Sequence, residues 1–110
     1  VIFEITPKQI ARRDATQGVL PCTNHFRMPG LIINDECWRF DRLQTAGQKS
    51  ALGVADIQAA LHSANQGEMT LQTMVFEPAD LVLHLALGMP PSSAHTMQRL
   101  ELKELLAPAE

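Results

Sequence analysis

The sequence MTLQTMVFEPADLVLHLAL, residues 69–87, decides the fold. It predicts two strands, Met69–Phe76 and Leu81–Leu87, joined by the turn Glu77-Pro78-Ala79-Asp80. Pro78 suits the second position of a type I turn, because its ring sets φ at about −65°. Both strands are apolar on nearly both faces, and strands of this kind are usually covered on each side.

Two helices are predicted before the hairpin. In the first, Asn34 is a good N-cap, acidic residues 35 and 36 suit the first turn, and Gly47 ends the helix after about Ala46. At about 100° per residue, Arg39 falls between Leu43 and Ala46 on the apolar arc, so it is expected to point inward.

The second helix spans about Val54–Ala64. Gly53 is its N-cap, and Asp56 occupies the capping-box position three residues later. Its apolar residues recur at helical spacing, which is typical of an amphipathic helix that packs on a core.

Three further strands are predicted from β-branched and aromatic residues: Val1–Thr6, Gln9–Asp14 and Val19–Phe26. The tail Thr96–Leu106 fits either a strand or a helix. This order of elements predicts an α+β fold with a mainly antiparallel sheet and two packing helices. With 110 residues and no internal repeat or linker, we expect one domain over residues 1–110.

Composition excludes several classes of protein. A hydrophobic fraction of 45% indicates a globular chain, and a net charge of −3 with scattered arginines argues against nucleic acid or an anionic membrane as partner. No apolar run approaches the ~20 residues of a membrane helix. Cys22 and Cys37 are predicted to be reduced thiols in a cytoplasmic protein.

No cofactor is predicted. The six glycines stand apart, so no phosphate-binding loop is present, and the four histidines lack the spacing of a metal site. We expect His84, on a hairpin strand, to be a hydrogen-bonded interior or flanking histidine rather than a ligand.

Two sets of residues are candidates for chemistry. A thiol site at Cys22 would need His25 as its base, but in a strand these side chains point to opposite faces, so a buried structural cysteine is the better interpretation. Asn24 at a strand end can donate to an oxyanion, and an inward Arg39 needs an acceptor. The structural alternatives are a turn asparagine and an arginine paired with a nearby carboxylate such as Asp35 or Asp41.

A resemblance to a known family favours the second set. VLPCTNHF (residues 19–26) resembles the Thr-Asn segment of amino-terminal-nucleophile hydrolases, in particular choloylglycine hydrolase, penicillin V acylase and acyl-coenzyme A:6-aminopenicillanate acyltransferase. CWRFDRL (residues 37–43) resembles the helix that follows in that family. Residues 54–57, 70–78 and 83–91 match later segments of the acyltransferase-like branch in the same order.

The resemblance implies an αββα sandwich and hydrolysis or transfer at a linear amide. Asn24 would be the oxyanion-hole asparagine, and Arg39 the active-site arginine beside the nucleophile. The nucleophile in this family is an amino-terminal cysteine freed by autocatalytic cleavage, with its own α-amino group as base.

This chain departs from the family pattern. Val1 cannot be the nucleophile, and position 37 is cysteine where serine is common. The chain also opens directly on an apolar run without a methionine. We therefore expect residues 1–110 to be the carboxy-terminal half of such an enzyme, inactive without its amino-terminal half. The alternative is a non-enzymatic module that folds alone, as a homodimer, and binds a small ligand or partner.

Overall fold

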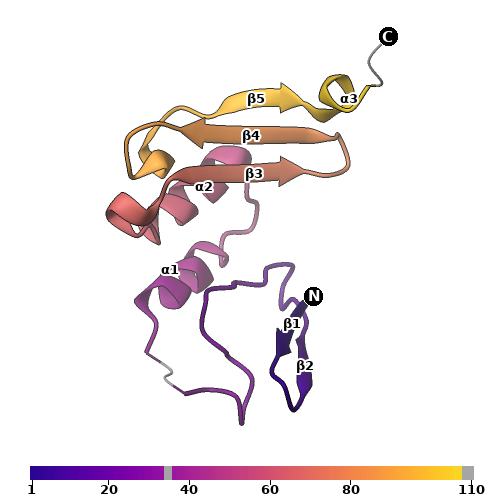
Figure 1. Ribbon diagram of the computed structural model, residues 1–110, viewed down its shortest axis with the longest axis vertical. Helices are drawn as coiled ribbons and strands as arrows, with labels where there is room; N and C mark the ends of the chain where they lie inside the picture. The colour runs from indigo at the N-terminus through magenta and orange to yellow at the C-terminus, as the bar shows by residue number, and fades with distance from the viewer. Residues whose placement is uncertain (34–35, 108–110) are drawn as a thin grey trace. The chain divides into compact units, whose positions relative to one another are not determined.

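Helix and antiparallel sheet occur together in both parts of the chain. The computed structural model describes residues 1–33 and 36–107, which divide into two units, Val1–Ser50 and Ala51–Glu110 (Figure 1). Every strand pair that the structure describes in these ranges is antiparallel, so the predicted α+β class is confirmed. That the two units form a single domain stays a prediction.

The first unit begins with a short hairpin. Strands β1 (Ile2–Ile5) and β2 (Ile10–Arg13) pair with Ile2 opposite Arg13 and Ile5 opposite Ile10. Both lie within the predicted strands.

The predicted strand Val19–Phe26 is wrong. Beyond an isolated bridge between Thr16 and Val19, this stretch is a loop. Pro21 has no N–H to donate to a ladder, and the loop is held by side-chain contacts instead. We call residues 20–26 the site loop.

Strand β1 buries its charged residue and exposes its apolar ones. Glu4 is 6% exposed, whereas Phe3 and Ile5, on the opposite face of the strand, are both exposed. Removing a carboxylate from water costs free energy, so a buried carboxylate needs several hydrogen-bond donors around it. The position of Glu4 therefore indicates that polar contacts, and not apolar packing, organise this unit.

Helix α1 (Trp38–Ala46) begins later than predicted. Its N-cap is Cys37, in extended conformation, and Glu36 precedes the helix instead of lying in its first turn. The predicted N-cap, Asn34, lies outside the described residues. The predicted apolar side of α1 is confirmed in part. Leu43 and Ala46 are half-buried, but no residue of the helix is fully buried.

Gly47 ends α1 as predicted, but for a different reason. Its φ of −69° is ordinary for any residue, so no left-handed turn requires glycine here. A Cβ at this position would lie 2.6 Å from Cγ1 of Val19. Glycine is therefore favoured because the end of α1 lies so close to Val19, which precedes the site loop.

The second unit is a three-stranded sheet with a helix beside it (Figure 1). Its elements are α2 (Val54–Ser63), η1 (Gly67–Met69), β3 (Gln72–Glu77), β4 (Val82–Leu87), η2 (Ser92–Ala94), β5 (Gln98–Glu101) and α3 (Leu102–Leu105). The strand order is β3-β4-β5. The predicted capping of α2 is confirmed, since Oδ2 of Asp56 accepts the N–H of Gly53 at 3.1 Å.

The predicted hairpin is confirmed together with its turn, but its first strand begins later than predicted, at Gln72, because Met69 belongs to η1. Glu77 pairs with Val82, and the N–H of Asp80 donates to the carbonyl of Glu77 at 3.2 Å. The ambiguous tail contains both predicted forms in succession, because strand β5 passes directly into helix α3.

One face of this sheet is covered and the other is exposed. Thr73, Val75 and Ala86 are buried on the face that meets α2 and η2. Side chains alternate along a strand, so the intervening residues point to the other face. We call this the open face; it comprises Gln72, Met74, Phe76, Leu83, Leu85, Leu87, Gln98 and Leu100.

The open face is uncharged and mostly apolar, yet much of it is exposed. Phe76 is 54% exposed and Leu87 is 57% exposed. Within the second unit the hairpin is covered on one face, whereas the sequence predicts cover on both. The core is correspondingly small, and the buried apolar side chains of the described ranges are those of Cys37, Val75, Val82 and Ala86.

The contact at Gly47 yields a prediction. Gly47→Ala should lower the free energy of unfolding by about 1–3 kcal/mol, because its methyl group would overlap Val19. Urea unfolding measures this change. Gly53→Ala is the control, since a Cβ there has its nearest heavy atom at 3.7 Å.

Adding Val19→Ala to Gly47→Ala should recover part of the loss, because the two residues share one contact. A Gly47→Ala protein that is as stable as the wild type would contradict the assignment.

Candidate functional site

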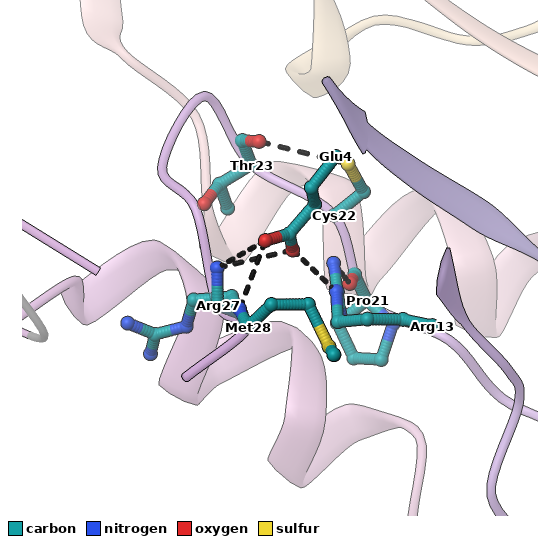
Figure 2. A network of polar contacts seen from close by, with 7 residues as sticks. All are labelled: Glu4, Arg13, Pro21, Cys22, Thr23, Arg27 and Met28. Atoms are coloured by element: carbon teal, nitrogen blue, oxygen red, sulfur yellow. Dashed lines mark hydrogen bonds and ion pairs between the residues drawn. The ribbon is translucent and has the colours of Figure 1, made fainter. Parts of the chain in front are cut away.

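The carboxylate of Glu4 joins three segments of the first unit (Figure 2). Its Oε1 accepts Nε–H of Arg13 at 2.6 Å and the backbone N–H of Arg27 at 3.0 Å. Its Oε2 accepts the backbone N–H groups of Arg27 at 2.9 Å and Met28 at 2.8 Å. A single side chain thus links β1, β2 and the segment that follows the site loop.

These contacts keep Glu4 ionised. Burial alone raises the pKa of its carboxyl group, but the N–H groups of Met28 and Arg27 and the guanidinium of Arg13 together lower it below the ordinary value of 4.5. Arg13 is itself only 12% exposed, so the pair is largely removed from water. A buried charge with this many donors is stable, but losing one partner is costly.

Both ends of the site loop are held by the same network. At the start, Nη2 of Arg13 donates to the carbonyl of Pro21 at 3.2 Å. After the end, Arg27 and Met28 bind Glu4, and the guanidinium carbon of Arg27 lies 4.0 Å from the centre of the Phe40 ring. The loop is therefore fastened to the hairpin at both ends and to α1 through Phe40.

The structure brings the two predicted site residues together. Nη2 of Arg39, on α1, donates to Oδ1 of Asn24, in the site loop. Asn24 is exposed and Arg39 is half-buried. The structural alternative pairs Arg39 with Asp35 or Asp41; Asp35 lies outside the described residues. That Asn24 and Arg39 act in catalysis stays a prediction.

The direction of this hydrogen bond determines what Asn24 can do. An asparagine amide has one accepting oxygen and one donating nitrogen. Because Arg39 occupies Oδ1, the amide orientation is set, and Nδ2 is the group that can donate to a substrate. A positive charge beside an amide donor is an arrangement that stabilises a developing oxyanion.

Cys37 lies next to this pair and was not predicted as part of it. Its Sγ is 3.6 Å from Oγ1 of Thr23, and its side chain is buried. Burial raises the pKa of the thiol, but the Thr23 hydroxyl, the N–H groups of Phe40 and Arg39 and the charge of Arg39 lower it below 9.0. The sulfur forms no side-chain hydrogen bond that caps helix α1.

The interpretation of Cys22 as a buried structural cysteine is wrong. Cys22 is exposed, because residues 20–26 form a loop and have no sheet to cover them. Its Sγ contacts the carbonyl of Thr23 at 3.6 Å. In the described ranges, Nδ1 of His25 is buried without a hydrogen-bond partner, so this nitrogen does not bind the Cys22 thiol.

A cavity of about 490 Å³ lies elsewhere in the first unit. Its wall includes apolar side chains of Val19, Leu20 and Met28, together with Arg12 and Arg13. Both arginines have acidic partners, since Arg12 binds Asp14 and Arg13 binds Glu4. Neither Asn24 nor Arg39 lines this cavity, so it is separate from the candidate site.

Two histidines of the second unit have hydrogen-bond partners within that unit. Nε2 of His84 lies 2.6 Å from Oε1 of Glu77, which confirms His84 as a hydrogen-bonded histidine. Nδ1 of His62 lies 2.9 Å from Oγ of Ser93, which joins α2 to η2. No cluster of three metal-binding side chains occurs in the part of the chain that the structure describes.

Glu4, Thr23 and Cys37 are the residues that sequence reasoning missed. A charged residue inside the apolar run Ile2–Ile5 is a signal of a buried ion pair, and the neighbouring strand ends in Arg12-Arg13. Thr23 gives no such signal, because its partner Cys37 is fourteen residues away across a loop.

Comparisons with family models, curated proteins and solved structures found no match to this chain. Among the described residues, no helix has the length and apolar character needed to cross a membrane.

The Glu4 network predicts acid sensitivity. The pKa of Glu4 is lower in the folded than in the unfolded chain, so its contacts stabilise the fold above the unfolded pKa. That stabilisation is lost as the pH falls through the folded pKa. Glu4→Gln should cost about 3 kcal/mol at pH ~7 and should flatten the pH dependence of urea unfolding below 4.5.

Asp14→Asn is the matched control. It removes a carboxylate from an ion pair that is 62% exposed on each side, so it should cost no more than about 1 kcal/mol. If Glu4→Gln and Asp14→Asn lower the free energy of unfolding equally, the Glu4 network does not hold this unit together.

Proposed function

We propose that this chain is the carboxy-terminal portion of a cysteine amidohydrolase or acyltransferase of the amino-terminal-nucleophile type, acting on a linear amide. The observation that carries the proposal is the contact between Asn24 and Arg39. The two residues belong to separate segments that resemble consecutive parts of that family. Their contact gives the geometry that a shared role in one site requires.

The chemistry follows from the amide donor. A cysteine thiolate, supplied by the amino-terminal half, attacks the carbonyl carbon of the substrate amide, and negative charge develops on the carbonyl oxygen. Nδ2–H of Asn24 donates to that oxygen, while Arg39 holds the Asn24 amide by its Oδ1. The carbon–nitrogen bond then breaks, the amine leaves with a proton, and water or a second amine takes the acyl group from the thioester.

The open face also supports the sandwich that this proposal implies. Cross-strand neighbours on it form the rows Phe76–Leu83–Leu100 and Met74–Leu85–Gln98, without a charged residue. A mostly apolar sheet face of this kind can pack against a second sheet at about 10 Å. In the αββα arrangement two sheets lie face to face, and the rest of the polypeptide would supply the second of them.

The experiment is a determination of the natural polypeptide by intact mass, together with its coding sequence. A reading frame that extends upstream and a chain cleaved immediately before a cysteine would support the proposal. A start codon directly before Val1 would contradict it.

For the complete protein, Asn24→Ala should lower the turnover of an acyl 4-nitroanilide about a hundredfold or more, as expected for loss of an oxyanion donor. Arg39→Leu should lower turnover more than it lowers the free energy of unfolding. Arg42→Leu is the matched control, because Arg42 lies on the same helix but over the Trp38 ring, at 5.1 Å. An unchanged rate for Asn24→Ala would remove this residue from the site.

A second candidate is a non-enzymatic module that pairs through the open face as a homodimer. It is favoured by the exposure of Phe76 and Leu87, because contiguous apolar faces mark interaction surfaces. In this candidate the Asn24–Arg39 contact is structural, and the ligand is a small molecule or a partner protein.

Light scattering with size-exclusion chromatography distinguishes the second candidate. The 110-residue chain should be a dimer, and Phe76→Glu should make it a monomer, because a charge would have to be buried between the sheets. Thr96→Glu, at an exposed position of the same unit, should leave the dimer unchanged. A wild-type chain that is monomeric would eliminate the homodimer.

A further inference from the structure

The position of Asn24 depends on side-chain contacts, because the site loop has no strand partner along its length. The contacts of Arg13 with Pro21 and of Glu4 with Arg27 fix the two ends of the loop. Asn24 lies between these ends. Something in the middle of the loop must therefore set the distance from Asn24 to α1.

Thr23 has the contact that does this. It is half-buried, and its Oγ1 lies 3.6 Å from Sγ of Cys37. Cys37 is 4% exposed and is the N-cap of α1, so its position is set by the helix and the loop can pack against it. The Thr23–Cys37 contact joins the same two segments as the Asn24–Arg39 pair. Thr23 precedes Asn24 by one residue in the loop, and Cys37 precedes Arg39 by two residues at the start of the helix.

The Asn24–Arg39 pair is weak by itself. A hydrogen bond from a long arginine side chain to an exposed acceptor must offset the rotamer freedom that both side chains lose. A neighbouring contact lowers the backbone part of the ordering cost, because Asn24 follows Thr23 directly in the chain.

We propose that Thr23 is a positioning residue, whose contact with Cys37 holds the site loop so that the Asn24 amide meets Arg39. This role rests on the proposed function for its importance in turnover, but the geometry is testable without any turnover. Burial raises the pKa of the Cys37 thiol, and the Thr23 hydroxyl is among the groups that lower it, which agrees with a contact between these two side chains.

The test uses nuclear Overhauser effects between the Arg39 guanidinium protons and the Asn24 amide protons, measured on the 110-residue chain. Thr23→Val keeps the shape of the side chain but removes the hydroxyl, and should abolish the effect. Thr23→Ser keeps the hydroxyl and should retain it. Cys22→Ser, which alters the exposed thiol beside Thr23, is the control and should also retain it.

Cys37→Ala provides a second route if Thr23→Val does not fold, because it removes the other side of the contact and should also abolish the effect. An Arg39–Asn24 effect that persists in a folded Thr23→Val protein would overturn the proposal. Loss of the effect in Thr23→Ser would overturn it as well, because the hydroxyl would then not be the cause.

In the complete protein, Thr23→Val should lower kcat about tenfold or more while KM stays nearly unchanged, because a misplaced donor weakens transition-state binding. If the complete protein has no amide-cleaving activity, the proposed function fails, whereas the Overhauser measurement still decides the role of Thr23.

Discussion

The carboxylate of Glu4 is the interaction on which the first unit depends. It accepts hydrogen bonds from Arg13 on β2 and from the backbone of Arg27 and Met28, beyond the site loop. Few apolar side chains are buried in this unit, so hydrophobic packing contributes little to its organisation. A desolvated carboxylate that binds several donors imposes one arrangement, because every alternative leaves a charge without partners. The candidate site is built on that arrangement.

The exposed apolar surfaces are the second constraint on this protein. Phe3 and Ile5 are exposed on β1, and the open face of the second unit exposes Phe76 and Leu87. Exposed apolar side chains favour association with another sheet or another copy, because burial stabilises by about 25 cal/mol per Å² of apolar surface. Both candidate functions cover the open face, and they differ in what covers it.

The site could be predicted in part because its two members belong to short segments with recognisable residue types. Asn24 follows a Thr in the site loop, and Arg39 lies on the inner side of a helix, so each attracts attention separately. Their contact, and the roles of Glu4 and Thr23, could not be predicted. Those depend on which parts of the loop approach the helix, and no local pattern encodes contacts between segments that lack a common strand register.

The sequence by itself determined the β3–β4 hairpin, the extent and capping of α2 and the α+β class, because strand alternation, turn residues and helix caps are local properties. Only the tertiary structure decided that residues 20–26 are a loop, that Gly47 is needed for its contact with Val19, and that Glu4 is buried. These features depend on neighbours distant in sequence, whose contacts outweigh local propensity.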